Sequence, residues 1–380
     1  MASDHNGSEH ISKSPAWISL GEPAAAIMIN LDQYQAARCK AVLLDRSDRG
    51  RIVLRGHDRK SFLHALLTND IAVLAPGTGC YAALLTASGR MMADMHVLEL
   101  GDVTLLDVHG GVKDMVLAKL DQLIFTEDVQ LGDVTGKWGC LGVYGPQAPA
   151  VVGRVAGGQS SGAAVALTEE LAGSGNYHNR RIEVLGDIVV AARVDEFGLP
   201  GIWMFADLDR CEALGASLEA AGAVRMDAGV ASVLRIEAGE PAFGAELTDD
   251  IIPLEAGIEQ RAISFTKGCY PGQEIVIRIL HRGHGKVLRK LVGLAVGGDT
   301  TSSGGDTVPS GGNPVPSGGN RVEKDGKDVG GVTSAAYSPR LGRPIALAYV
   351  HRDYLEPGTS LQIKHADVTL NATVSALPFA

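Results

Sequence analysis

Hydrophobic and polar positions along the first 145 residues follow two periods, which predict strands and helices in turn. Apolar residues alternate well enough over 41–54 to predict strands, whereas Phe62, Leu63 and Leu66 recur at the spacing of one helix face. A Ser-Gly pair at 88–89, between two alternating runs, is typical of a hairpin turn. The strands are expected at 41–54, 80–85, 91–100, 103–108, 128–131 and 138–143, and the second helix at 112–123. This order favours α+β architecture over a doubly wound sheet.

A second α+β unit is expected from 146 to 229, and a β-rich unit at the end of the chain. The expected strands and helices of the second unit and its exit lie at 182–192, 202–206, 208–221 and 227–238. Short strand patterns at 329–332, 345–350 and 361–363, between Gly and Pro turns, predict a small β-barrel or jelly-roll. The segment 297–320 consists almost wholly of Gly, Ser, Thr, Asp, Asn, Pro and Val, so we expect a flexible loop there.

Composition and charge narrow the class of protein. A chain of 380 residues is expected to form two or three domains. The formal charge of -10 disfavours stable nucleic-acid binding, which needs a basic face. Five scattered cysteines without a CxxC pair argue against a disulfide scaffold and a zinc site, and no metal is expected. The polar start of the chain does not resemble a signal peptide, and no apolar run could span a bilayer, which predicts a cytoplasmic protein with a loose tail at 1–16.

The most distinctive motif of the chain is KGCYPGQE. Its residues are Lys267, Gly268, Cys269, Tyr270, Pro271, Gly272, Gln273 and Glu274. The two glycines permit backbone conformations closed to other residues, so Cys269 is expected on a tight, exposed loop. Lys267 beside it could favour a reactive thiolate. The alternative is a structural turn with an incidental thiol, and the residues by themselves leave both open. The basic segment 278–290 that follows fits either a solvated hairpin or a contact for an anionic partner.

This motif resembles the KGC[YF]xGQE signature of YgfZ-type proteins, a branch of the folate-binding aminomethyltransferase (glycine-cleavage T-protein) superfamily. Three further strings agree with that superfamily in order. They are LLTND at 66–70, LRIEAG at 234–239 with IPLEAG at 252–257, and GVTS, SP, LG and ALAYV between 331 and 350. The resemblance covers roughly 41–363 and leaves out the N-terminal tail and the Gly/Ser segment.

The resemblance implies a cloverleaf of three domains around a tetrahydrofolate site, two α+β and the last a β-barrel. The implied boundaries are 17–145 for the first domain, 146–229 for the second and 285–380 for the barrel. Residues 230–284 would return to complete the folate-binding core. The expected ligand is tetrahydrofolate or a one-carbon derivative of it.

The resemblance also implies roles for individual residues. Asp94 falls at the second Asp of a GGxxDD segment, whose carboxylate assists transfer at the folate nitrogen, and Cys269 is the other candidate for a catalytic role. Tyr81 falls at an aromatic position beside the folate, and Arg235 is the Arg of LRxEAG that faces the folate. The expected cofactor-binding residues are Asn69, Tyr81, Asp94, Arg235 and Tyr270. The residues alone favour structural roles: Tyr81 as a core strand residue, Asp94 as a strand-edge acid and Arg235 as a helix-surface cation.

The chain also departs from the T-protein pattern. The first Asp of the pair is Ala93, and the string that supplies a pterin-facing Glu is replaced at 193–203, where Asp195 or Glu196 is the candidate substitute. These departures weaken amine-substrate transfer more than folate binding.

Three functions therefore remain open. The first is a tetrahydrofolate-binding accessory protein that supports assembly or repair of iron–sulfur cluster enzymes, including tRNA-modifying ones, with such enzymes or assembly factors as partners. The alternative is a folate-dependent aminomethyltransferase or demethylase that transfers a one-carbon unit to tetrahydrofolate. The third is an interaction module that has kept the fold and lost the ligand.

Overall fold

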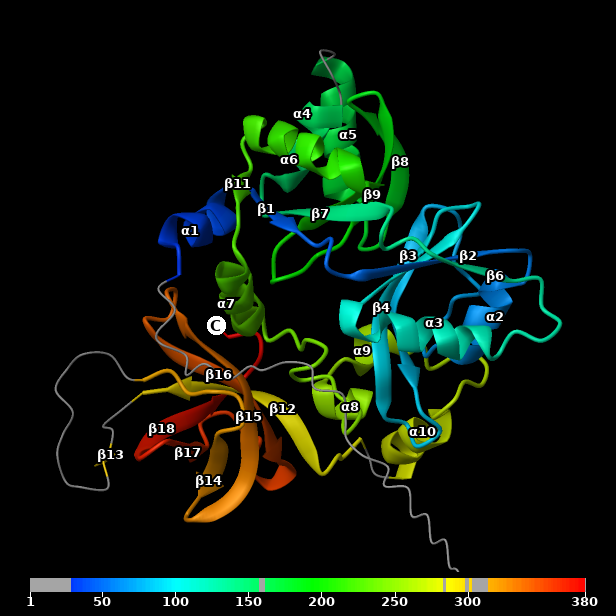
Figure 1. Cartoon of the computed structure of the whole chain (residues 1–380). Coiled ribbons are helices and arrows are strands. Elements are labelled where there is room, and N and C mark those ends of the chain that lie inside the picture. Colours follow the sequence, from blue (N-terminus) through cyan, green and yellow to red (C-terminus); the bar gives the residue numbers. More distant parts are fainter. Residues whose placement is uncertain (1–28, 157–160, 283–284, 298–300, 303–313, 380) are drawn as a thin grey trace, which may run out of the picture.

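The computed structural model describes residues 29–156, 161–282, 285–297, 301–302 and 314–379 (Figure 1). They form a five-stranded sheet, a six-stranded sheet and a closed barrel, which surround the helix α7 (Ala228–Ala238) and the segments that follow it. Within the described ranges, no helix is both long and apolar enough to cross a bilayer. The expected tail at 1–16 lies outside the described residues.

The five-stranded sheet has the order β3-β4-β5-β2-β6 and confirms the elements expected after residue 49. Its strands are β2 (Gly50–Arg55), β3 (Thr78–Leu85), β4 (Met91–Glu99), β5 (Thr104–Val108) and β6 (Gln130–Asp133). The helices α2 (Arg59–Leu66) and α3 (Lys113–Asp121) bury Phe62, Leu63, Val116 and Leu120 against one face. A 3-10 turn, η1 (Gly110–Val112), leads into α3. The other face packs against the six-stranded sheet and the segments after α7, and it carries the polar groups described below.

The six-stranded sheet has the order β11-β1-β7-β10-β9-β8. Its strands are β1 (Val42–Asp45), β7 (Trp138–Tyr144), β8 (Asn179–Val184), β9 (Asp187–Arg193), β10 (Gly201–Asp207) and β11 (Val224–Arg225). Strand pairing crosses the expected boundary at residue 145, because β1 and β10 both pair with β7. The single strand expected at 182–192 is wrong. The chain turns at Leu185-Gly186, both with positive φ, and apolar residues continue through the turn, so the pattern did not reveal it.

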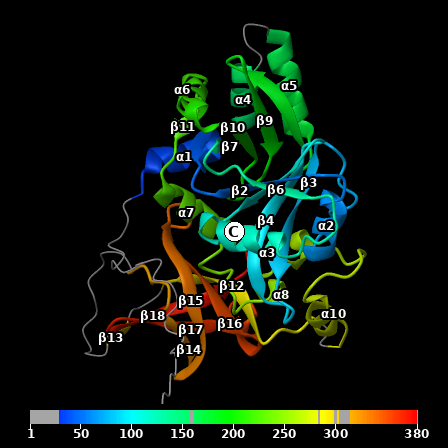
Figure 2. The same cartoon turned by 45° about the vertical axis from the view of Figure 1, so that its right-hand side comes forward.

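Helices cover the six-stranded sheet on the side away from the barrel (Figure 2). They are α4 (Ala148–Ala156), α5 (Ser161–Gly173), the 3-10 turn η2 (Leu208–Arg210) and α6 (Cys211–Ala220). Only the last was expected, because the helices α4 and α5 consist largely of Ala, Val and Gly without a clear polar face. The helix α1 (Leu31–Cys39) precedes β1 and begins at Asn30, whose side chain accepts from two backbone N–H groups.

The connecting segment runs from α7 through α8 (Pro253–Ala256), α9 (Glu259–Ala262) and α10 (Gln273–Arg282). The helix α7 begins at Asp227 and ends at Gly239, whose φ of 69° suits a helix C-terminus. Thr68 Oγ donates to Ala262 O and Ser264 N donates to Thr68 O, so α9 is fixed against the five-stranded sheet. The solvated hairpin considered for 278–290 is wrong in its first part, since residues through Arg282 continue the helix α10.

The barrel confirms the expectation for the C-terminal domain. Its strands are β12 (Arg289–Val296), β14 (Arg321–Lys324), β15 (Lys327–Ser338), β16 (Arg343–His351), β17 (Ser360–His365) and β18 (Val368–Ser375). They close because β12 pairs with both β16 and β18. The short β13 (Thr301–Ser302) adds to β18, and η3 (Arg352–Tyr354) follows β16. The loop expected at 297–320 falls mostly on residues outside the described ranges.

Candidate functional site

The strand β4 presents a row of partly accessible side chains on the sheet face that α2 and α3 leave free. Met92, Asp94 and His96 form this row, while Ala93 and Met95 between them are fully buried under the helices. The alternation follows from the period of two in a strand. Asp94, which the sequence resemblance singled out, therefore lies on the face that meets the six-stranded sheet and α9.

Asp94 and Tyr81 form a hydrogen-bonded pair. Tyr81 Oη on β3 donates to Asp94 Oδ2 at 2.8 Å. Asp94 Oδ1 is buried and has no hydrogen-bond partner among the described residues. The guanidinium of Arg261, from α9, covers the Tyr81 ring with its Cζ 4.7 Å from the centroid. Because a carboxylate oxygen without a partner costs free energy in a buried position, this oxygen is available to a ligand.

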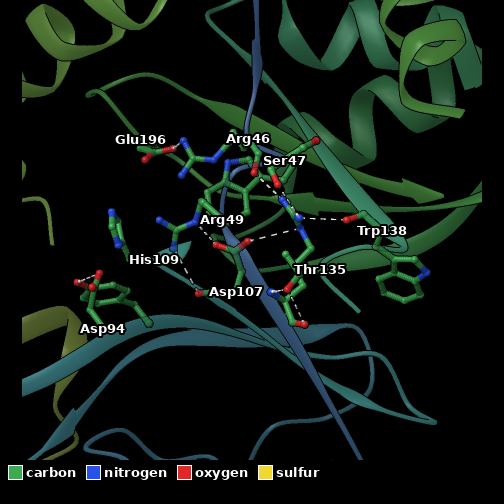
Figure 3. Close-up of polar contacts among 12 residues, drawn as sticks. Arg46, Ser47, Arg49, Asp94, Asp107, His109, Thr135, Trp138 and Glu196 are labelled. Carbon is green, nitrogen blue, oxygen red and sulfur yellow. Dashed lines mark hydrogen bonds and ion pairs between the residues drawn. The ribbon is translucent and has the colours of Figure 1, made fainter. Parts of the chain in front are cut away.

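Two arginines of the β1–β2 connection, Arg46 and Arg49, lie near Asp94 (Figure 3), and Arg51 follows them on β2. Arg49 Nε donates to Asp107 Oδ1, and Arg46 pairs with Glu196 at 2.9 Å. Arg51 is fully buried and donates to backbone carbonyls, including Trp138 O at 3.0 Å. Burial disfavours the charged form of Arg46, but Glu196 and other groups outweigh burial and raise its pKa. These ion pairs hold positive charge beside Asp94.

Of the two candidate acids, Glu196 contacts the arginines, through Arg46, and Asp195 does not. Glu196 accepts from Tyr144 Oη at 2.8 Å, and Tyr144 in turn accepts from Trp203 Nε1 at 2.8 Å. Asp195 is held by Arg193 on the other side of the turn. The sequence had left these two acids as equal candidates.

Two histidines complete the site, and both are held in the neutral form. Burial lowers the pKa of His96 well below its ordinary value, and nearby Arg49 adds to the effect. Burial and Arg49 also lower the pKa of His109, although Asp94 opposes this. We call Tyr81, Asp94, His96 and Arg261, with the adjoining Arg46, Arg49, His109 and Glu196, the central site.

Arg235 takes a structural place. Its guanidinium donates to Glu246 Oε2 at 2.8 Å and to Ser334 Oγ at 2.8 Å, and Ser334 donates to Glu246 Oε1. These bonds join α7 to the barrel strand β15 around a fully buried carboxylate. The expected contact between Arg235 and a ligand has no support in this geometry, because the guanidinium is engaged within the protein.

Asn69 also acts inside the protein, but next to the central site. Its side-chain amide donates to Tyr81 O at 2.8 Å and to Arg261 O at 3.1 Å. It therefore positions both residues without presenting its own polar atoms as the first contact for a ligand.

The KGCYPGQE motif forms a loop that joins α9 to α10. Lys267 Nζ donates to His64 O and Leu67 O at the C-terminal end of α2, so it satisfies carbonyls there and does not serve Cys269. Tyr270 is buried. Gly272 has a φ of 82°, and a Cβ there would lie 2.5 Å from Thr86 O, so glycine is required.

The other members of the motif fill out this picture. Gly268 is outside the left-handed region, contrary to the expected special conformation, and Gln273 and Glu274 begin α10. Cys269 is exposed, as expected. Among the described residues, no hydrogen bond, ion pair or ring contact joins 267–274 to Asp94. The motif therefore makes no polar contact with Asp94, although Tyr270 belongs to the same buried cluster as Tyr81.

The half-buried position of Lys267 predicts a pH dependence of stability. Burial lowers its pKa from 10.5 to about 8, although Asp70 opposes this. Between these values the unfolded chain holds the proton more tightly, so raising the pH favours the folded state. We expect the free energy of unfolding of the wild type, relative to Lys267→Met, to increase from pH 8 to pH 10.5 in urea titrations. A constant or falling difference would contradict this.

Comparison with known proteins identifies relatives of this chain. Residues 15–267 match the family model described as the GCVT N-terminal domain, and residues 289–380 match the glycine cleavage T-protein C-terminal barrel domain. A protein of Rubrobacter xylanophilus named aminomethyltransferase is 30% identical over 347 residues, which are 91% of this chain and 85% of that protein. One of the same name from Corynebacterium jeikeium is 28% identical and covers 92% of this chain and 90% of its own.

A solved structure shows the same fold. The glycine cleavage system aminomethyltransferase T from Bartonella henselae superposes with a TM-score of 0.75 at 21% identity, covering 92% of this chain and 89% of that chain. These relatives carry the aminomethyltransferase name, so the comparisons support the superfamily expected from the sequence and do not extend to the narrower YgfZ-type assignment. The chain belongs to the glycine-cleavage T-protein family.

Proposed function

We propose that this protein binds tetrahydrofolate in the central site and transfers a one-carbon unit to it as a folate-dependent aminomethyltransferase. The observation that carries the proposal is the Asp94 carboxylate, with one oxygen held by Tyr81 and the other buried without a partner among the described residues. Relatives named aminomethyltransferase, matched over most of their length, support the reaction class.

The residues of the central site suit this ligand. The pterin of tetrahydrofolate is flat with polar edges, and such rings bind between aromatic walls with a few polar contacts. Tyr81 and His96 bring aromatic rings to the site, with the fully buried Trp203 packed against His96, and Asp94 supplies an acceptor. A cavity of about 430 Å³ between the connecting segment and the barrel is lined in part by Arg261, which also covers the Tyr81 ring.

Tetrahydrofolate would supply a nitrogen that accepts the one-carbon unit. Within the protein, Asp94 would accept or return the proton at that nitrogen, with Tyr81 fixing its orientation. Arg49, held by Asp107, keeps positive charge close to Asp94. The neutral His109 lies beside both groups.

The test is transfer itself. The purified protein is incubated with tetrahydrofolate and an aminomethyl donor, which releases ammonia as its carbon passes to tetrahydrofolate, and methylene-tetrahydrofolate is measured through a coupled dehydrogenase. We expect turnover with at least one donor class. Saturable folate binding without turnover on any donor would remove the transferase and leave folate binding standing.

A second candidate is the accessory role in iron–sulfur enzyme assembly or repair, with those enzymes as partners. The observation that favours it is the exposed Cys269 on a loop whose other residues have structural roles. A single cysteine cannot hold a cluster, which normally takes four ligands, so a partner or a small thiol would have to contribute.

This candidate predicts that Cys269→Ser keeps folate affinity but fails to restore iron–sulfur enzyme activity in a strain that lacks the protein. The matched control is Cys39→Ser, which changes another exposed thiol on α1. Full restoration by Cys269→Ser would remove the accessory role of the thiol.

A further inference from the structure

Two neighbouring side chains of β4 carry buried polar atoms without a partner. They are Asp94 Oδ1 and His96 Nδ1, and neither has a hydrogen bond among the described residues. Residues two apart on a strand point to the same face about 7 Å from each other. Each such atom costs free energy in a protein without a ligand, and a bound molecule that meets both would recover it.

The packing around His96 fixes its ring without using its polar edge. The imidazole centroid lies 5.3 Å from that of Tyr81, 5.7 Å from Tyr177 and 4.6 Å from Trp203. Trp203 meets it edge-on at 70°, and its own indole N–H is taken by Tyr144. Three rings from three elements therefore set the orientation of His96, and the described neighbours leave Nδ1 for something else.

The charges that face His96 set its protonation state. Arg46 and Arg49 approach from the β1–β2 connection and Arg261 from α9, while Asp94 is on its own strand. A neutral imidazole has one donor and one acceptor nitrogen, whereas an ionised carboxylate only accepts. His96 and Asp94 together therefore offer both donor and acceptor groups. The polar edge of a pterin also carries donors and acceptors, which can pair with them.

We propose that His96 is a second hydrogen-bonding contact to the ligand of the central site, and that with Asp94 it recognises the polar edge of a reduced pterin. The assignment rests on the proposed folate binding and extends it to a residue that the sequence did not single out. In this proposal His96 determines ligand specificity through a hydrogen bond from or to a ring nitrogen. Stacking of its ring contributes less to recognition.

The experiment separates the nitrogen from the ring. Calorimetric titration with tetrahydrofolate is compared for the wild type, His96→Phe and Tyr177→Phe; the last keeps a ring against His96 and serves as control. We expect His96→Phe to bind roughly tenfold more weakly, about the effect of one lost hydrogen bond, and Tyr177→Phe to bind like the wild type. Equal affinity of His96→Phe and the wild type would overturn the assignment.

A second measurement needs no substitution. In protein labelled with nitrogen-15 histidine, the Nδ1 resonance of His96 should shift when tetrahydrofolate saturates the site. An unshifted resonance in a saturated sample overturns the role of His96 and leaves the proposed function intact. If the wild type binds no tetrahydrofolate at all, the proposed function fails, and the role of His96 fails with it.

Discussion

Replacing Asp94 by asparagine is expected to slow one-carbon transfer by roughly a hundredfold to ten-thousandfold, the usual contribution of a positioned proton-transfer group. The change keeps the size of the side chain and the hydrogen bond from Tyr81, so the fold should survive. Affinity for tetrahydrofolate should fall much less than the rate, because binding also uses ring packing.

The assay is the coupled transfer assay on the wild type, Asp94→Asn and two controls. Tyr81→Phe removes only the hydrogen bond that orients Asp94, and it should cost severalfold in rate. Asp121→Asn changes an exposed carboxylate on α3 and should leave the rate unchanged. A rate in Asp94→Asn within a few fold of the wild type would mean that Asp94 carries no proton in the reaction.

The largest effect on stability is expected from Asp107→Ala. The Asp107 side chain is fully buried and faces the guanidinium groups of Arg49 and Arg51. Its removal leaves two buried cations without their carboxylate, which costs about 3–5 kcal/mol of unfolding free energy. Urea denaturation at neutral pH measures the loss.

The matched control for Asp107 is Asp102→Ala. Asp102 pairs with Arg181 at the surface, with both side chains largely accessible, so its loss should cost no more than about 1 kcal/mol. A cost for Asp107→Ala as small as that of Asp102→Ala would show that the arginine cluster does not depend on the buried acid.

Local patterns predicted the elements well wherever apolar periodicity was strong. The hairpin of β3 and β4 and the closing barrel follow directly from alternation and turn residues. The hairpin of β8 and β9 was not predicted because Leu185 lies in the turn. Leu185 has a positive φ there, which is uncommon for an apolar residue. The pairing of β1 with β7 joins residues about a hundred positions apart, and no local pattern encodes that.

The candidate site was predictable only in part. Tyr81 and Asp94, which the resemblance assigned to the folate site, lie on paired strands and share a hydrogen bond. The ion pairs of the arginines with Asp107 and Glu196 were not predicted. The signal in the sequence was the presence of three arginines between positions 46 and 51, within a predicted strand region. The partners of Arg235, which are Glu246 and Ser334, come from distant segments, so the sequence did not indicate them. The same holds for Lys267, whose acceptors are backbone carbonyls at the end of α2.

The most direct test of the central claim is a calorimetric titration of the intact protein with tetrahydrofolate, repeated with Asp94→Ala and Asp121→Ala. The structure predicts saturable binding at one site per chain, clearly weakened by Asp94→Ala and unchanged by Asp121→Ala. Equal weakening by both variants, or no binding by the wild type, would contradict a folate site built around Asp94.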